Sequence, residues 1–214
     1  MTKFIFVRHG QSQSNIENRF AGQSETALTK DGQEQAELLC NWIFQNHKVD
    51  AIYTSSLDRA YKTALPYFKM SGTKIIKDDT LREINAGKWQ GEKYVDIKEK
   101  YPEEFDVWKN DIGNAKLPDG ESVRELSERI VSEIKRIAQN NPDKTVMVVS
   151  HGVAIRAMMA VFLKGDICYA KELTWVPNAS VTVANYDNGK MQFELIGFND
   201  YLGDIKSYVP ANLI

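Results

Sequence analysis

Two histidines stand where short apolar runs end, and each is followed directly by glycine. Residues 4–7 lead into Arg8-His9-Gly10, and residues 146–149 lead into Ser150-His151-Gly152. Continuous apolar runs of this kind are typical of strands buried on both faces of a parallel sheet. Ligands of open α/β sheets bind at the carboxyl edge, to which such strands deliver polar residues. The repeated arrangement predicts that both histidines belong to one site at that edge.

The residues around the first histidine suit phosphoryl chemistry. A neutral imidazole is a competent nucleophile near pH 7, and the planar guanidinium of arginine matches phosphate oxygens. Arg8 would supply a permanent positive charge beside His9, and Gly10 would let the backbone turn and approach a ligand closely. The alternative is a salt-bridged arginine beside a core histidine, which would be preferred if this pair stood alone.

Arg59 and Glu83 could extend this site. Arg59 lies near the start of a helix predicted after strand 51–54, and a second arginine would help because a transferring phosphoryl group spreads charge over three oxygens. Glu83 could protonate a leaving alkoxide and later activate water. The plain alternatives are a surface arginine paired with Asp58 or Glu83, and a solvated loop acid.

Composition limits the class of protein. The chain has 214 residues, of which 43% are hydrophobic and 26% charged, and this predicts one globular domain over residues 1–214. A net charge of -2 without any Lys/Arg block argues against nucleic-acid binding. No apolar run approaches a bilayer span and no signal peptide precedes the first strand, so we expect a cytoplasmic protein without membrane contact. Cys40 and Cys168 lack CxxC spacing and are interpreted as small apolar residues.

Alternating strand and helix patterns predict a three-layer α/β/α fold with a mostly parallel central sheet. Helices are expected over 30–46, with Thr29 as N-cap, over 122–140 and over 153–163, and a further helix should follow a capping serine in Ser55-Ser56. Strands are expected over 51–54, 146–149, 181–186 and 191–196, the last two joined by a hairpin turn at Asn188-Gly189. Residues 198–214 receive no assignment.

Between residues 78 and 119, glycines and prolines divide the chain into short polar and aromatic pieces. Such a segment is typical of a cap-like excursion, irregular or helical, over the carboxyl edge. Its aromatic residues are expected mainly to pack the excursion, with a minority lining a substrate wall; they are Trp89, Tyr94, Tyr101, Phe105 and Trp108. Residues 175–178 are expected to form a structural loop, with the alternative that they place a late-chain residue near the pocket. Glu121 is expected to be a helix-start acid.

Motifs along residues 3–163 follow one another in the order of a known family. Arg8-His9-Gly10 is followed by Ser12, Asn15 and the run Arg19-Phe20-Ala21-Gly22. Later matches are Thr54-Ser55-Ser56-Leu57-Asp58-Arg59-Ala60, Leu81-Arg82-Glu83 with Gly87-Lys88-Trp89-Gln90-Gly91, Pro118-Asp119-Gly120-Glu121-Ser122, and Val149-Ser150-His151-Gly152 with Ile155-Arg156. Together they resemble the phosphoglycerate mutase-like branch of the histidine phosphatase superfamily.

The resemblance implies a role for each matching position. His9 would be the phosphorylated nucleophile and Glu83 the proton donor. The phosphate pocket would be formed by Arg8, Arg59 and His151, with contributions from Asn15, Gly22 and Gly152. Phosphoryl transfer would pass through phosphohistidine without a metal or other cofactor, so the cations of the pocket would stabilise the charge. His151 would act when protonated or when donating a hydrogen bond to a phosphoryl oxygen, whereas His9 must be neutral to attack.

The segment after Glu83 distinguishes two activities within this family. Mutases that resemble this chain carry an additional Arg-His-Tyr-Gly stretch there, whereas residues 84–91 resemble the shorter version of broad-specificity and α-ribazole-type phosphatases. A phosphomonoester hydrolase acting on a small phosphorylated metabolite is therefore preferred, with a cofactor-dependent phosphoglycerate mutase as the alternative. Gln11 and Ala21 differ from residues common among relatives, and the substrate depends on residues 88–116, so no particular substrate is predicted.

Two further classes stay open at this stage. One is a phosphate-ligand binding module without turnover, and the other is a metalloenzyme with His9 and His151 as ligands. The presence of His9, Glu83 and His151 together argues against the binding module. The neighbouring arginines argue against the metalloenzyme, because they repel a cation. The oligomeric state is left open, with a homodimer as one option.

Overall fold

A six-stranded sheet forms the centre of the computed structural model, which describes residues 1–207. The strands are β1 (Thr2–Arg8), β2 (Ala51–Ser55), β3 (Ile75–Asp78), β4 (Thr145–Ser150), β5 (Val181–Asp187) and β6 (Lys190–Phe198). Their order is β3-β2-β4-β1-β5-β6. The first four are mutually parallel, β5 pairs antiparallel with β1, and β6 pairs antiparallel with β5. The predicted α/β fold with a mostly parallel sheet is thereby confirmed.

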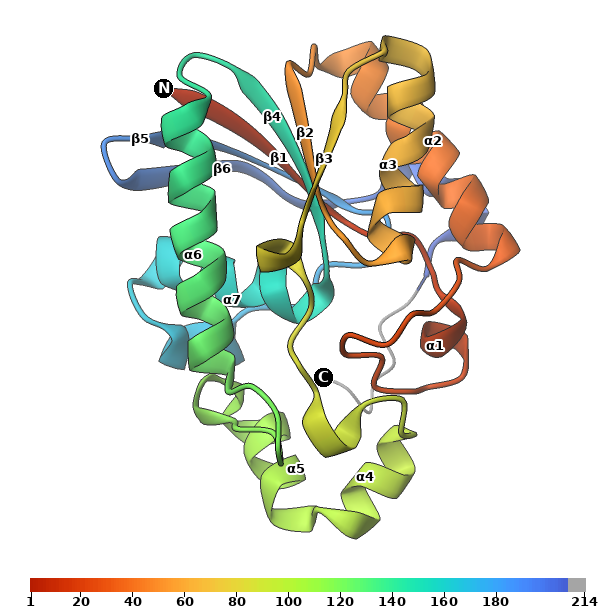
Figure 1. The fold of residues 1–214 in the computed structure, drawn as a ribbon, viewed down its shortest axis with the longest axis vertical. Helices are drawn as coiled ribbons and strands as arrows, with labels where there is room; N and C mark the ends of the chain where they lie inside the picture. Colours follow the sequence, from red (N-terminus) through yellow and green to blue (C-terminus); the bar gives the residue numbers. More distant parts are fainter. Residues whose placement is uncertain (208–214) are drawn as a thin grey trace.

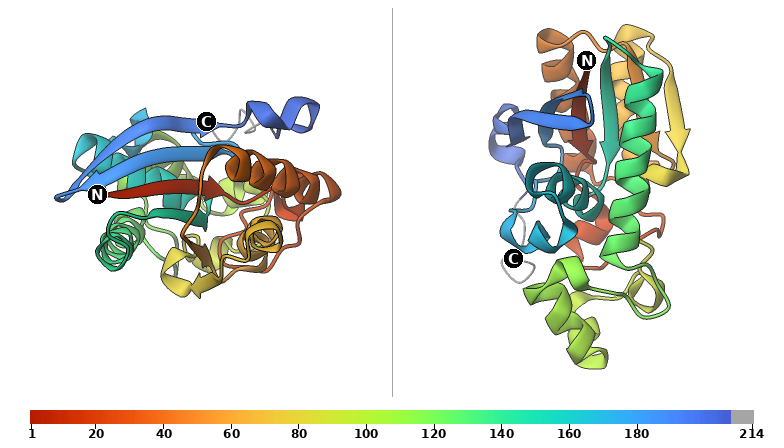
Figure 2. Two further views of the ribbon diagram at one scale, coloured as in Figure 1. Left: turned by 90° about the horizontal axis from the view of Figure 1, so that it is seen from above. Right: turned by 90° about the vertical axis from the view of Figure 1, so that its left-hand side faces the viewer.

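Helices cover both faces of this sheet, because alternate residues of the central strands face two separate cores. Ile5 and Val7 pack in one core with residues of α2 (Lys30–Asn46) and α3 (Asp58–Ser71). Phe4 and Phe6 pack in the other with residues of α6 (Val123–Asn140) and α7 (Gly152–Lys164). Figure 1 shows α6 on one side of the strands and α2 and α3 on the other, and Figure 2 shows the same layers from two further directions.

Caps mark the starts of α2 and α6, and the predicted Thr29 cap is confirmed. The Thr29 side chain accepts a hydrogen bond from the Gly32 N–H at the start of α2, and Ser122 and Glu125 form a capping box at the start of α6. Asn188 and Gly189 both have positive φ at the turn between β5 and β6, as a two-residue hairpin requires.

The predicted serine cap of α3 was wrong. The N-cap position of this helix is Leu57, which offers no side-chain acceptor. Ser55 does accept a hydrogen bond from the Leu57 N–H at 3.3 Å, one residue before the helix begins, but its hydroxyl is also bonded to His151. Ser56 turns instead to Asp79 and Arg82. The polar residues between β2 and α3 are therefore used for tertiary contacts across the sheet edge.

The segment between β3 and α6 lies beyond the carboxyl ends of the parallel strands (Figure 1). It contains 3₁₀ turns at Asp79–Leu81, Gly87–Trp89 and Ile112–Asn114 and the short helices α4 (Tyr94–Lys100) and α5 (Pro102–Asn110). A short helix near the chain start, α1 (Gln13–Ile16), precedes Phe20, whose ring lies 5.0 Å from that of Trp108 between centroids. Aromatic packing thus joins this segment to the loop after β1.

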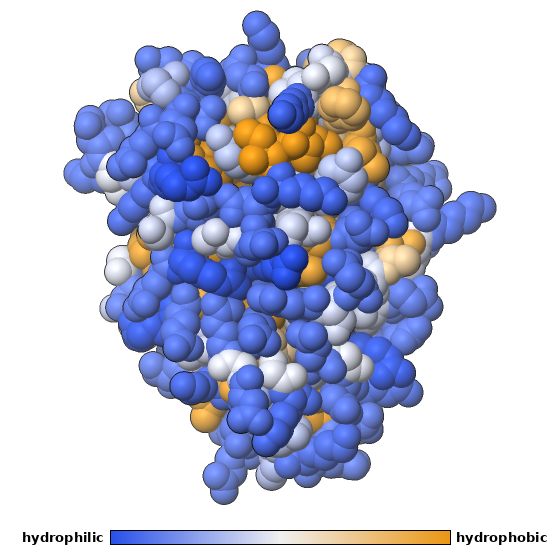
Figure 3. Space-filling model, viewed as in Figure 1, coloured by the Kyte–Doolittle hydropathy of each residue, from blue (hydrophilic) through white to orange (hydrophobic). Residues whose placement is uncertain are grey.

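Two further 3₁₀ stretches follow α7: Ile167–Glu172 lies between α7 and β5, and Asp200–Ile205 follows β6. The second of these, and Ser207, fall in the part left without a sequence assignment; residues 208–214 lie outside the described residues. Within residues 1–207, no helix combines the length and apolar character needed to cross a bilayer. The face drawn in Figure 3 is mainly hydrophilic, with an apolar patch toward the end opposite α4 and α5.

Candidate active site

One cavity at the carboxyl edge of the sheet brings the predicted site residues together. Seven of the eight line it: Arg8, His9, Asn15, Gly22, Arg59, Glu83 and Gly152. His151 is fully buried beside this cavity, and its ring centroid lies 5.1 Å from that of His9. Parallel pairing of β1 with β4 explains this proximity. Arg8 and Ser150, the last residues of the two strands, lie in register, and a histidine directly follows each of them.

His9 has the ring orientation and charge state of a nucleophile. Its Nδ1 lies 2.7 Å from the carbonyl oxygen of Gly10, which can only accept a hydrogen bond, so Nδ1 carries the proton and Nε2 the free lone pair. Burial, and then the positive charges of Arg59 and Arg8, lower the pKa of His9 well below its usual value. The ring is therefore neutral at physiological pH.

Two arginines are fixed in the cavity wall by backbone carbonyls. Arg8 donates from Nη1 to the carbonyl of Val176 at 2.7 Å. Arg59 donates to the carbonyls of Ser24 and Gly22, at 2.8 and 2.7 Å. Burial lowers the pKa of Arg59 to about 10, so it keeps its positive charge at neutral pH. The expected alternative of an exposed arginine paired with Asp58 is wrong, because Arg59 is 1% exposed and Asp58 pairs with Lys62.

His151 is held from behind by Ser55, whose Oγ lies 2.7 Å from Nε2. Burial, followed by the charge of Arg59, lowers the pKa of His151 well below its usual value. The ring is thus neutral, and a hydrogen bond from it to a ligand requires the tautomer with the proton on Nδ1. In that tautomer the Ser55 hydroxyl donates to Nε2. Of the two modes expected for His151, neutral donation fits the free protein.

Three buried nitrogens of these residues have no hydrogen-bond partner within residues 1–207: Arg8 Nε, Arg59 Nε and His151 Nδ1. Buried polar groups in folded proteins are almost always paired, because an unpaired one costs about 1–3 kcal/mol. Three such nitrogens at one site, two of them on cations, favour an anionic ligand that accepts from them.

The Glu83 side chain points at the first turn of α7 and accepts three backbone hydrogen bonds, two from that turn and one from the next residue, Ile84. The donors are the N–H groups of Ile84 (3.0 Å), Val153 (3.1 Å) and Ala154 (3.2 Å). Burial raises the pKa of Glu83, and these hydrogen bonds and the charges of Arg59 and Arg8 offset that effect only in part. The expected alternative of a solvated acid is wrong, since the side chain is buried and aimed at the helix start. A raised pKa suits a group that must hold a proton and release it.

Asn15 and Gly22 shape the cavity in different ways. The Asn15 side-chain oxygen accepts from the Ser12 N–H, the Ser12 hydroxyl and Asn178, which leaves its N–H groups for a ligand. Gly22 has a φ of +50°, and an added Cβ would lie 2.6 Å from the Cβ of Ala86. The backbone conformation and this close approach together require glycine, whose carbonyl then holds Arg59.

The preferred interpretation of residues 175–178 as a structural loop was wrong, and the alternative, a late-chain residue near the pocket, is correct. Trp175 and Asn178 line the cavity, and Asn178 donates to the His9 carbonyl at 3.0 Å as well as to Asn15. Tyr94 and Trp108 also line the cavity, in agreement with the prediction that a minority of the aromatic residues of the excursion would do so. Ser55 was missed as a partner of His151. No spacing in the sequence marks Ser55 or Asn178, because each meets its histidine only through the packing of distant segments.

The arrangement of side chains does not resemble a cation site. Within residues 1–207 there is no group of three or more His, Cys, Asp or Glu side chains placed to hold a metal ion. Both described cysteines are free, and Cys40 is buried beside α3, away from the cavity lining. The positive charges of Arg8 and Arg59 act on both histidines and that of Arg129 acts on His151, and such charges attract anions.

Comparison with known proteins agrees with this geometry. The model of the histidine phosphatase superfamily (branch 1) matches residues 4–199. The chain therefore belongs to the histidine phosphatase superfamily.

Individual relatives extend over nearly the whole chain. Phosphoserine phosphatase 1 of Hydrogenobacter thermophilus is 32% identical over 212 residues, which cover 99% of each protein. The Escherichia coli protein named probable phosphoglycerate mutase GpmB is 30% identical over 190 residues, covering 87% of this chain and 86% of its own. The solved structure of Bacillus stearothermophilus YhfR matches with a TM-score of 0.90 and 27% identity, covering 94% of this chain and all of that one. The family and the phosphatase among these relatives support a phosphatase.

Proposed function

We propose that the protein is a metal-independent phosphomonoester hydrolase that acts through a phosphohistidine on His9. The observation that carries this proposal is the pairing of a neutral His9, with its Nε2 lone pair free, with three unpartnered buried nitrogens of Arg8, Arg59 and His151. A nucleophile and donors for a phosphoryl group then occur together. Glu83 supplies the remaining requirement, a carboxyl group with a raised pKa.

In the first step, the Nε2 atom of His9 attacks phosphorus, and the bond between phosphorus and the ester oxygen breaks. Glu83 gives its proton to the departing oxygen, so the leaving group departs as a neutral alcohol. Arg8, Arg59, His151 and the Asn15 amide donate hydrogen bonds to the other phosphoryl oxygens, and the two arginines stabilise the negative charge of the transition state.

In the second step, water attacks the phosphorus of phosphohistidine. Glu83, now ionised, takes a proton from that water, the bond between phosphorus and Nε2 breaks, and inorganic phosphate leaves. His9 returns to its neutral form with the proton still on Nδ1, and Glu83 is protonated for the next cycle. Gly10 and Asn178 hold the ring and its backbone in place throughout.

The substrate is a small phosphorylated metabolite. Beyond the phosphate residues, the cavity wall combines neutral polar side chains, aromatic rings and one cation, Arg19; the polar and aromatic residues include Gln11, Asn18, Asn178, Tyr94, Trp108 and Trp175. Walls of this kind bind a polar leaving group by hydrogen bonds and by contact with a ring face. Phosphoserine, named in one relative, is the first compound to test.

A phosphoglycerate mutase is the second candidate, because one relative carries that name. The short connection after Glu83 favours hydrolysis. Only residues 84–86 separate Glu83 from the 3₁₀ turn Gly87–Trp89, which leaves no room for an inserted closing segment there. A mutase must exclude water while it retains the intermediate, and a longer cover serves that purpose.

A screen of phosphorylated metabolites, including phosphoserine and both phosphoglycerates, tests this function. The wild-type protein should release inorganic phosphate in the presence of EDTA, and the His9→Ala variant should release none. Interconversion of phosphoglycerates faster than phosphate release would favour the mutase. Binding of phosphate without turnover of any compound would instead indicate a phosphate-binding module, and loss of activity with EDTA would point to a metalloenzyme.

A further inference from the structure

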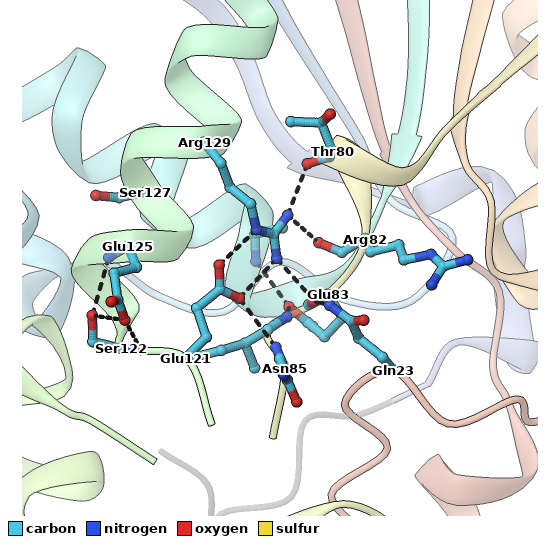
Figure 4. A network of polar contacts seen from close by, with 12 residues as sticks. Gln23, Thr80, Arg82, Glu83, Asn85, Glu121, Ser122, Glu125, Ser127 and Arg129 are labelled. Atoms are coloured by element: carbon cyan, nitrogen blue, oxygen red, sulfur yellow. Dashed lines mark hydrogen bonds and ion pairs between the residues drawn. The ribbon is translucent and has the colours of Figure 1, made fainter. Parts of the chain in front are cut away.

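Arg129, on α6, contacts the segment that carries Glu83. Its Nη1 donates to the carbonyls of Thr80 and Arg82, both at 2.8 Å, and its Nη2 donates to the carbonyl of Glu83 at 3.0 Å. Figure 4 shows the guanidinium facing these three carbonyls. A single side chain from a rigid helix therefore holds the backbone of the proposed proton donor and of the residues just before it.

Glu121 completes this contact from the other side. Its two oxygens accept from Arg129 Nε at 2.6 Å and Nη2 at 2.9 Å, in the paired geometry that gives strong arginine–carboxylate bonds. The Glu121 carboxylate also accepts from the Asn85 N–H at 3.1 Å, and the Glu121 N–H donates to the Asn85 carbonyl at 2.8 Å. The network thus reaches the backbone on both sides of Glu83 (Figure 4).

Every N–H of the Arg129 guanidinium is used in this network. Nε–H bonds to Glu121, the two Nη1 hydrogens bond to Thr80 and Arg82, and the two Nη2 hydrogens bond to Glu83 and Glu121. Lysine has three donors on one atom and cannot reproduce this planar fork. The arrangement needs the shape of arginine in addition to its charge.

We propose that Arg129 and Glu121 are positioning residues that keep the Glu83 carboxyl group aimed at the leaving oxygen. The inference rests on the proposed role of Glu83 as proton donor. The carboxylate end of Glu83 is held by α7 and its backbone by Arg129 and by Gln23, which donates to the same carbonyl at 3.0 Å. With Arg129 removed, residues 80–83 lose three hydrogen bonds to their carbonyls, and the carboxyl group is then aimed only by its bonds at α7 and Ile84 and by the Gln23 contact.

The dependence of the rate on the leaving group separates this role from a general structural one. Alkyl phosphates need a proton on the departing oxygen, whereas p-nitrophenyl phosphate releases a stabilised anion that needs none. We would measure single-turnover phosphorylation of the protein with both substrates. The set comprises wild type, Arg129→Lys, Glu121→Gln, the double variant that combines these two changes, Glu83→Gln as the reference for loss of the donor, and Arg136→Lys as the control.

Arg136 is a matched control because it lies on the same helix and is also paired with acids, Glu133 and Asp78, but contacts neither Glu83 nor its neighbours. Arg129→Lys should slow alkyl phosphate turnover about 10- to 100-fold, as a misplaced catalytic group does. Its rate with p-nitrophenyl phosphate should change less than threefold. Arg136→Lys should match wild type with both substrates, and the thermal melting curves verify that each variant is folded.

The outcomes are distinct. Two results together support a positioning pair that acts as a unit. Arg129→Lys should lose rate mainly with the alkyl phosphate, as Glu83→Gln does, and the double variant with Glu121→Gln should lose no more than Arg129→Lys alone. Equal losses with both substrates, or no loss, overturn it. If Glu83→Gln itself shows no leaving-group dependence, the proposed proton donor fails, and the inference fails with it for that separate reason.

Discussion

The imidazole rings of His9 and His151 lie 5.1 Å apart between centroids, and both are neutral because they are buried beside arginines. Each ring is fixed by one short hydrogen bond, His9 through Nδ1 to Gly10 and His151 through Nε2 to Ser55. This leaves one nitrogen on each ring for a phosphoryl group between them, a lone pair on His9 and a donor on His151. In the proposed mechanism the two histidines therefore have opposite roles.

The first prediction concerns anion binding by Arg59. Arg59→Lys keeps the positive charge but loses the planar guanidinium. In the wild type, two of its nitrogens donate to the carbonyls of Ser24 and Gly22, and its Nε stays available for a ligand. We expect kcat/KM to fall about 10²- to 10³-fold, as for loss of a donor to transition-state charge. Calorimetric titration with inorganic phosphate should show weaker binding in parallel.

Arg124→Lys is the control for this measurement, since Arg124 is half exposed and pairs with Asp166 away from the cavity. It should bind phosphate as wild type does. Undiminished phosphate affinity in Arg59→Lys would contradict the assignment of Arg59 to the phosphate site.

The second prediction is the pH dependence of kcat/KM. His9 must be unprotonated, and its lowered pKa moves the loss of activity on acidification well below pH 6.5. Glu83 must be protonated in the first step, so activity declines as the pH rises through its raised pKa. Glu83→Gln should lower activity about 10²- to 10⁴-fold and remove that decline. A decline unchanged in Glu83→Gln would assign it to another group.

The third prediction concerns stability at acid pH. The folded protein keeps His9 and His151 unprotonated, whereas the unfolded chain takes up protons below about pH 6.5. The unfolded state then binds more protons, so the free energy of unfolding falls as the pH drops below that value, by about 1.4 kcal/mol per pH unit for each ring. Glu83, with its raised pKa, contributes in the opposite direction.

Urea denaturation of wild type and His151→Gln between pH 7 and pH 5 checks this prediction. The variant lacks one of the two rings and retains Glu83, so its stability should depend less steeply on pH, with the difference rising to about 1.4 kcal/mol per unit well below pH 6.5. Identical slopes would mean that His151 takes up a proton as readily in the folded protein as in the unfolded chain.

The fourth prediction compares two adjacent serines. Ser55→Ala removes the hydroxyl bonded to His151 in the interior and should lower the free energy of unfolding by about 1–3 kcal/mol, together with phosphate affinity. Ser56→Ala removes a hydroxyl from an exposed contact with Asp79 and Arg82 and should change stability by about 0.5 kcal/mol or less. Equal effects of the two substitutions would argue against a specific role of Ser55 behind His151.

Local patterns in the sequence were enough to predict the strands that lead to Arg8, His9 and His151, because short continuous apolar runs are typical of strands buried on both faces of a parallel sheet. The Thr29 cap and the Asn188-Gly189 turn were also predicted from local signals. Glu83 and Arg59 looked ambiguous by themselves, and only the family resemblance singled them out among many charged residues.

The contacts that complete the site join parts of the chain that no local pattern connects. Ser55 was expected to cap a helix, Asn178 to lie in a structural loop and Glu121 to begin α6, yet these residues bond to His151, His9 and Arg129. In each case the polar side chain bonds to a residue far away in the sequence, because the layers of the fold bring the sheet edge and its covering segments together. Tertiary packing decides between such partners.

Direct detection of the covalent intermediate tests the central claim. Wild type, His9→Ala and His47→Ala would be mixed with a phosphomonoester that the wild-type protein hydrolyses, quenched within milliseconds in alkali, digested and mapped by mass spectrometry. His47 is the third histidine of the chain and lies outside the cavity lining. We predict one acid-labile, base-stable phosphoryl group on His9 in wild type and His47→Ala, and none in His9→Ala. Turnover without this label, or a label on another residue, would contradict the account.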